Sequence, residues 1–129
     1  MSESEPRSEP TGMVPRVETR LSDFLGGRPE LPFALLLVVA GDARGAVLSV
    51  EELPAVIGRS HDVALTIGDE TVSRRHAELR GNRNELEIED LGSSNGTTLN
   101  GNDMVGAVTL HDGDLVGFGS ATVLVKSIS

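Results

Sequence analysis

Apolar positions after the first 32 residues come in short runs, which Gly, Asn, Asp and Pro interrupt roughly every 6–12 residues. Leu86 and Ile88 alternate with Glu87 and Glu89, which gives one face for a core and one face for water. The expected strands cover 33–40, 45–50, 55–59, 64–67, 76–80, 85–91, 97–100, 107–110, 114–118 and 121–127. We therefore predict an all-β fold, a sandwich of two antiparallel sheets with about 10–11 strands.

Residues 1–32 have a different pattern. They hold five of the six prolines and few large apolar side chains, so we predict a mostly disordered N-terminal tail. One segment of the tail, Val17–Leu25, places Leu21, Phe24 and Leu25 at helical spacing and predicts a transient helical turn or a short docking segment. The predicted organisation is a tail over 1–32 and one domain over 33–129.

Composition narrows the class of protein. The chain has 129 residues, a formal net charge of −9, no Cys, no Trp and no Tyr. The absence of Cys excludes disulfides, thiolate zinc sites and a cysteine nucleophile, and the negative charge argues against nucleic acid. The longest apolar run, Leu31–Ala40, contains Pro32 and is too short to span a membrane. We expect a cytoplasmic monomer without a cofactor or a metal ion.

Basic residues are unevenly distributed. Residues 33–129 contain 14 acids and 7 bases, yet five of the bases lie between positions 59 and 83. The two segments 71–74 and 93–97 add hydroxyl, amide and backbone N–H donors. Arginines beside many small donors suit a phosphate dianion, which accepts charge-assisted hydrogen bonds from both.

Four ordered motifs carry a resemblance to a known family. They are IGRS (57–60), SRRHAEL (73–79), LGSSNGTTLNG (91–101) and LHDGDLVGFG (110–119). In order and spacing they resemble the forkhead-associated (FHA) domain. This resemblance implies a β-sandwich that binds phosphothreonine.

The resemblance also implies a role for each binding position. Arg59 resembles the main phosphate-binding arginine, Ser73 the serine whose hydroxyl bonds the phosphate, and Arg74 a second phosphate contact. Ser94 resembles a further hydroxyl donor to the phosphate, at a position where Thr is common, so a methyl contact is missing here. Asn95 resembles the asparagine that bonds the ligand backbone.

Other positions resemble the structural residues of the family. His76 resembles the histidine that braces the binding loops, and a lone His among apolar strand residues is usually a core group in any case. Gly58, Gly96, Asn100 and Gly101 resemble turn formers.

Three other readings compete with phosphate binding. Ser73, His76 and Asp90 supply the residue types of a hydrolase triad, but the chain has no nucleophile elbow and no phosphate-binding P-loop. A metal site is the second reading, because the segments 61–62 and 111–114 contain His and Asp. Neither segment has the spacing of a known metal-binding motif. A purely structural assembly module, binding partners without regard to phosphate, is the remaining alternative.

The predicted function is therefore a phosphothreonine-binding signalling adaptor whose partners are proteins phosphorylated by an unidentified Ser/Thr kinase. Thr19, and less directly Thr11, are candidate phosphorylation sites in the tail, and a phosphate on Thr19 could occupy the protein's own site. The segments expected to choose the flanking residues of a ligand are 60–62, 69–71, 101–104 and 119–120.

Overall fold

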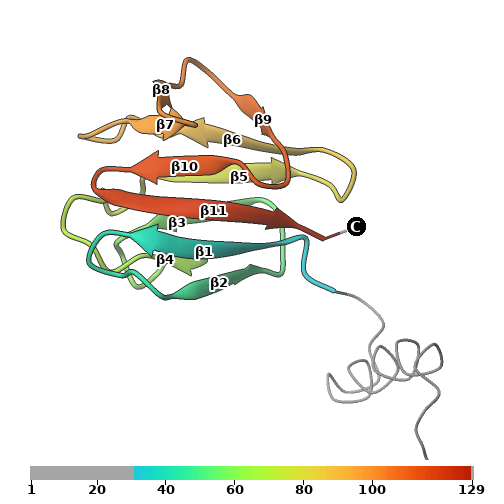
Figure 1. The fold of residues 1–129 in the computed structure, drawn as a ribbon, viewed down its shortest axis with the longest axis horizontal. Coiled ribbons are helices and arrows are strands. Elements are labelled where there is room, and N and C mark those ends of the chain that lie inside the picture. Colours follow the sequence, from blue (N-terminus) through green and yellow to red (C-terminus); the bar gives the residue numbers. More distant parts are fainter. Residues whose placement is uncertain (1–30, 129) are drawn as a thin grey trace, which may run out of the picture. The chain divides into compact units, whose positions relative to one another are not determined.

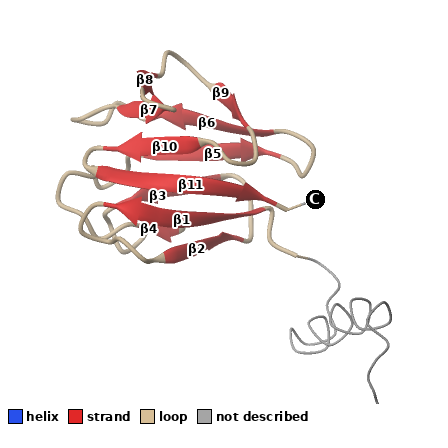
Figure 2. Cartoon of the chain, viewed as in Figure 1, coloured by secondary structure: helices blue, strands red, loops and turns tan. Residues whose placement is uncertain are grey.

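The computed structural model describes residues 31–128, which form eleven β-strands and no helix (Figure 2). No helix in this part of the chain is therefore long and apolar enough to cross a membrane. The strands are β1 (Ala34–Ala40), β2 (Val47–Val50), β3 (Ala55–Gly58), β4 (Leu65–Thr66), β5 (Ala77–Gly81), β6 (Leu86–Asp90), β7 (Thr97–Leu99), β8 (Asn102–Asp103), β9 (Val108–Leu110), β10 (Leu115–Phe118) and β11 (Ala121–Ser127).

Two sheets pack face to face, as the alternation of apolar positions predicts (Figure 1). One sheet has the strand order β2-β1-β11-β10-β7-β8, and the other has the order β4-β3-β5-β6-β9. All neighbouring strands are antiparallel except β3 and β4, in which Ile57 pairs with Leu65 in parallel. A short connection between two strands ordinarily predicts an antiparallel hairpin. Residues 59–64 instead form a loop after which β4 runs in the same direction as β3. The predicted all-β sandwich is confirmed.

The core consists of aliphatic side chains and Phe118 from the inner faces of both sheets. Leu86 and Ile88 are buried, as their alternation with Glu87 and Glu89 predicts. Phe118 is the largest fully buried side chain, and its ring meets the ring of the buried His76 edge-on, with 5.3 Å between the centroids.

The strand expected over 97–100 is one half of a short hairpin. Asn100 and Gly101 both have positive φ (51° and 88°) and join β7 to β8 as a two-residue turn. The sequence analysis missed β8 because its two residues, Asn102 and Asp103, are polar and exposed.

The predicted disordered tail lies outside the described residues, apart from Leu31 and Pro32. The same holds for the segment Val17–Leu25 and for Thr11 and Thr19.

Candidate functional site

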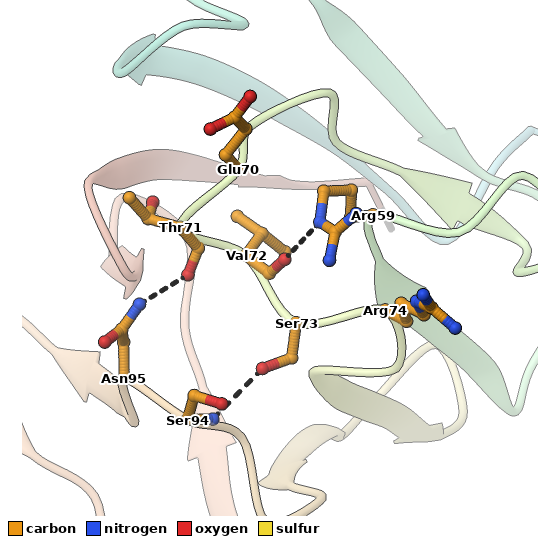
Figure 3. Close-up of a pocket in the computed structure, with 8 residues that line it drawn as sticks. All are labelled: Arg59, Glu70, Thr71, Val72, Ser73, Arg74, Ser94 and Asn95. Atoms are coloured by element: carbon orange, nitrogen blue, oxygen red, sulfur yellow. Dashed lines mark hydrogen bonds between the residues drawn. The ribbon is translucent and has the colours of Figure 1, made fainter.

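Three loops meet at one end of the sandwich. They are residues 59–64 after β3, residues 67–76 before β5, and residues 91–96 between β6 and β7. A pocket of about 250 Å³ opens between them (Figure 3). Its lining is Arg59, Glu70, Thr71, Val72, Ser73, Arg74, Ser94 and Asn95. The structure thus brings together all five residues that the FHA resemblance assigns to ligand binding.

Arg59 is the first residue after β3, and two hydrogen bonds fix it to the neighbouring loop. Its backbone N–H donates to the carbonyl oxygen of Ser73 (2.9 Å), and its Nε donates to the carbonyl oxygen of Val72 (3.0 Å; Figure 3). The side chain is exposed and has no ion-pair partner within residues 31–128. Its two terminal nitrogens are therefore left to bind an anion.

Ser73 and the 91–96 loop are joined directly. The hydroxyl oxygen of Ser73 accepts a hydrogen bond from the backbone N–H of Ser94 (3.0 Å), which leaves the Ser73 hydroxyl proton for a ligand. Asn95 donates from Nδ2 to the carbonyl oxygen of Thr71 (2.7 Å), so its Oδ1 can accept from a peptide N–H (Figure 3). Arg74 projects from the same loop, is exposed, and has no carboxylate partner in the described part of the chain.

His76 ties two of these loops together from inside the core. Its Nδ1 accepts a hydrogen bond from the backbone N–H of Ser73 (3.0 Å), so Nδ1 is unprotonated. Nε2 then carries the proton and donates to the carbonyl oxygen of Gly96 (2.9 Å). A neutral imidazole thus connects the loop that holds Ser73 to the loop that holds Asn95.

Asp90 organises the 91–96 loop, a role that the sequence analysis missed. Its carboxylate accepts from the backbone N–H groups of Gly92 and Ser93 and from the hydroxyls of Ser93 and Thr97. Burial raises the pKa of the Asp90 carboxyl, but the hydrogen bonds from Ser93 and Thr97 outweigh it and hold this pKa below its usual range. An Asp two residues before a Gly is the sequence signal of such an Asx turn.

Asp69 organises the other side of the site and was also missed. This carboxylate is 2% exposed and accepts hydrogen bonds from Thr71, from Ser120 and from the backbone N–H of Asp42. The bond from the Thr71 hydroxyl is the main reason why the pKa of Asp69 falls to about 2. No local sequence signal reveals this role, because two of the partners come from distant turns.

Thr71 and Ser120 join two of the four segments that we expect to select the ligand residues on either side of the phosphothreonine. Their hydroxyls lie 2.9 Å apart, and the backbone N–H of Ser120 donates to the Thr71 hydroxyl (2.8 Å). The rim formed by 69–71 and 119–120 is therefore one continuous surface beside Asn95.

One expected structural role is corrected. Gly58 was predicted as a turn former, but it lies in β3 and does not have a positive φ, whereas Gly96, Asn100 and Gly101 do. Gly58 is needed for a different reason: a Cβ at this position would lie 1.9 Å from the carbonyl oxygen of Arg74.

The residues of the competing hydrolase hypothesis do not form a triad. The ring of His76 binds the backbone N–H of Ser73, whereas the Ser73 hydroxyl faces the backbone of Ser94. The Oδ1 atom of Asp90 lies 3.8 Å from Nε2 of His76, which is too long for a hydrogen bond. It instead accepts hydrogen bonds from the hydroxyls of Ser93 and Thr97. A hydroxyl with no base in hydrogen-bond contact is not an activated nucleophile. Residues 31–128 also contain no cluster of three or more side chains that could hold a metal ion.

Comparison with known proteins gives a consistent result. A sequence profile described as "FHA domain" matches residues 55–119. The FHA domain-containing protein FhaB of Mycobacterium tuberculosis is 37% identical over 120 residues, which cover 91% of this chain and 77% of FhaB. The glycogen accumulation regulator GarA of the same species is 40% identical over 86 residues, which cover 67% of this chain and 52% of GarA.

The solved structures that resemble this chain are also FHA domains. An FHA domain studied for its phosphothreonine-dependent interactions superposes with a TM-score of 0.67 at 32% identity, over 74% of this chain and 97% of that one. The FHA domain of FhaA, solved in complex with the intracellular domain of another protein, superposes with a TM-score of 0.64 at 33% identity, over 72% of this chain and 99% of that one.

Proposed function

The chain belongs to the FHA domain family, and from this premise we propose that it is a non-catalytic adaptor that binds partner proteins phosphorylated on threonine. The observation that carries the proposal is the convergence of Arg59, Ser73 and Asn95 on one pocket (Figure 3). Arg59 and Arg74 both line that pocket and have no carboxylate partner among the described residues, so their charge is left to a ligand.

The chemistry of the pocket suits a phosphate group. A phosphorylated threonine carries a charge of about −1.5 to −2 at neutral pH and three acceptor oxygens. In the proposed complex Arg59 and Arg74 donate charge-assisted hydrogen bonds to these oxygens, and the hydroxyls of Ser73 and Ser94 donate shorter ones. The volume of about 250 Å³ fits one phosphorylated side chain with its adjoining backbone.

Asn95 gives the site its preference for a peptide. Its Nδ2 is already bound to the carbonyl oxygen of Thr71, so the amide plane is fixed before a ligand arrives. Its Oδ1 then accepts from the ligand backbone beside the phosphothreonine. Selection of threonine over serine rests on a single methyl group and so is worth about 1 kcal/mol if that methyl is buried.

The tail supplies a candidate ligand within the same chain. We propose that a Ser/Thr kinase phosphorylates Thr19, or alternatively Thr11, and that the phosphorylated tail competes with partner proteins for the pocket. A tethered ligand acts at an effective concentration on the order of millimolar, so even a weak intramolecular complex excludes partners.

The proposal is tested by titrating a peptide of residues 13–25 into the protein in a calorimeter, with Thr19 phosphorylated, replaced by phosphoserine, or unmodified. We expect binding only with phosphate, tighter for phosphothreonine, and a loss of at least tenfold in affinity for Arg59→Ala. Arg75→Ala is the matched control, because Arg75 is exposed and adjacent to Arg74 but does not line the pocket. Binding that ignores the phosphate, or that survives Arg59→Ala, contradicts the proposal and favours the assembly module.

A further inference from the structure

Two buried polar side chains lie behind the pocket without lining it. His76 is fully buried, and its ring connects Ser73 to the backbone of Gly96. Asp69 is 2% exposed and lies in the loop before β5, four residues ahead of Ser73. A charged group is costly to bury unless its oxygens accept hydrogen bonds, so the partners of Asp69 indicate what this carboxylate supports.

The Asp69 carboxylate joins three segments that are far apart in the sequence. Its Oδ2 accepts from the backbone N–H of Asp42 (3.0 Å), between β1 and β2, and from the hydroxyl of Ser120 (3.1 Å), between β10 and β11. Its Oδ1 accepts from the backbone N–H of Thr71 (2.9 Å) and from the Thr71 hydroxyl (2.6 Å). Donors face both oxygens, so the ionised carboxylate, which only accepts, is the form that fits.

Two glycines allow the outer turns to approach this carboxylate. A Cβ on Gly41 would lie 2.7 Å from Oδ2 of Asp69, and a Cβ on Gly119 would lie 2.4 Å from the carbonyl oxygen of Thr71. Both glycines also have positive φ (101° and 61°). A side chain at either position would push the turn away from the loop, so the close packing depends on its absence.

Thr71 connects the buried carboxylate to the pocket. Its hydroxyl donates to Asp69 and accepts from the backbone N–H of Ser120 (2.8 Å), so this side chain is held on two sides. The carbonyl oxygen of the same residue accepts the hydrogen bond from Nδ2 of Asn95 (2.7 Å; Figure 3). The orientation of the Asn95 amide therefore depends on where Thr71 is held.

The phosphate-binding residues have other supports. The backbone N–H of Ser73 donates to the ring of His76. Arg59 donates to the carbonyl oxygens of Val72 and Ser73. The N–H of Val72 donates in turn to the backbone carbonyl of Asp69, and not to its carboxylate. The side chain of Asp69 is thus bonded towards Asn95 and not towards the groups that face the phosphate.

We infer that Asp69 is a positioning residue for peptide recognition. It acts through Thr71 on Asn95 and orients the amide whose Oδ1 accepts from the ligand backbone, while Arg59 and Ser73 bind the phosphate group without its help. This inference rests on the proposed function, because it assigns a support to one part of that site. Its consequence is that the contacts to the peptide backbone and to the phosphate can be weakened separately.

A double-mutant cycle in the full chain tests the inference. Asp69→Asn, Asn95→Ala and the double variant are titrated, by NMR, with inorganic phosphate and with a capped five-residue peptide that has phosphothreonine at its centre and alanine elsewhere. Asparagine at position 69 sets an NH₂ group against N–H or O–H donors in either orientation of its amide. We expect Asp69→Asn to lower the affinity for the peptide by about 3–10-fold, but by less than about twofold when Asn95 is already Ala. The affinity for inorganic phosphate should stay within about twofold in Asp69→Asn.

Asp42→Asn is the matched control for the loss of one negative charge. Asp42 gives Asp69 only its backbone N–H, and its own side chain is exposed, so the affinity for the peptide should change by less than about twofold. Thr71→Val is a second route to the same loss, because it removes the hydroxyl between Asp69 and the Thr71 backbone and leaves the carboxylate in place. Thr71→Ser, which keeps the hydroxyl, should recover most of the affinity that Thr71→Val loses.

The side-chain amide of Asn95 reports the same connection without a ligand. Its protons should exchange with solvent faster in Asp69→Asn than in the wild type, and equal exchange rates would overturn the inference. An equal loss of peptide affinity with and without Asn95 would also overturn it, as would a parallel loss of affinity for inorganic phosphate. A wild-type protein that binds neither probe contradicts the proposed function instead, and the exchange rates then still decide whether Asp69 positions Asn95.

Discussion

The backbone of Gly58 passes so close to the carbonyl oxygen of Arg74 that a Cβ on Gly58 would lie 1.9 Å from that oxygen. The same approach permits the hydrogen bond from the backbone N–H of Arg59 to the carbonyl oxygen of Ser73. Two residues of the phosphate pocket are thus held in register by the absence of a side chain one residue away.

Gly58→Ala should therefore damage both stability and binding. The new methyl group meets backbone rather than a flexible side chain, so β3 or the 73–75 loop must move, and we expect the free energy of unfolding to fall by about 2–3 kcal/mol or more. Urea denaturation measures this loss, and calorimetry with the phosphothreonine peptide measures the accompanying loss of affinity. Gly68→Ala is the matched control: a Cβ there has open space, and its φ is not positive, so stability should stay within about 1 kcal/mol of the wild type.

His76→Phe should separate the packing of the ring from its hydrogen bonds. Phenylalanine preserves most of the contact with Phe118 but leaves the backbone N–H of Ser73 and the carbonyl oxygen of Gly96 without their partners. Each unsatisfied buried group costs about 1–3 kcal/mol, so we expect the two groups together to lower the free energy of unfolding by about 2–6 kcal/mol in urea denaturation. Hydrogen exchange at the Ser73 amide should accelerate. Unchanged stability would contradict the bracing role, and the exposed His61, replaced by Phe, serves as control.

Asp69 should make the free energy of unfolding depend on pH in acidic solution. Its folded pKa of about 2 lies below its ordinary value of 3.8, so the stabilisation is complete above about pH 4 and is lost as the pH falls towards 2. The lost contribution is on the order of 2 kcal/mol. Asp90 and Asp112 also have lowered pKa values, so they contribute in the same direction.

The comparison with Asp69→Asn isolates this residue. The variant should be less stable than the wild type at pH 6, and the difference should shrink between pH 4 and pH 2, because both proteins are then uncharged at position 69. Urea denaturation across this pH range measures both quantities. A difference that stays constant with pH would mean that the ionised form of Asp69 contributes nothing.

Glu70 should disfavour acidic residues beside the phosphothreonine. It is exposed on the rim of the pocket and has no ion-pair partner in residues 31–128 (Figure 3). We expect peptides with Arg next to the phosphothreonine to bind about 2–5-fold more tightly than peptides with Glu there, with the ratio falling as salt is added. Fluorescence anisotropy at two salt concentrations measures the ratio. Glu70→Gln should remove the preference and Glu85→Gln should preserve it; an equal preference in all three proteins would exclude Glu70 as its source.

The sequence alone determined the strands other than β8 and the order of the binding motifs. Strand periodicity and turn residues are local properties, so Leu86 and Ile88 could be assigned to the core and Asn100-Gly101 to a tight turn before any contact was known. Five of the eight residues that line the pocket were also named in advance, because the FHA resemblance assigns roles to motif positions such as Arg59, Ser73 and Asn95.

The tertiary structure alone decided which distant groups meet. Asp69 bonds to turns that are 27 and 51 residues away, and no local pattern encodes such a contact. The outward face of β1 could not be predicted for a related reason. Every residue of Ala34–Ala40 is apolar, so the strand has no alternation of apolar and polar residues that would identify its solvent-exposed face. Only the packing of the second sheet determines that Leu36 and Val38 are buried and that Leu37 faces outward.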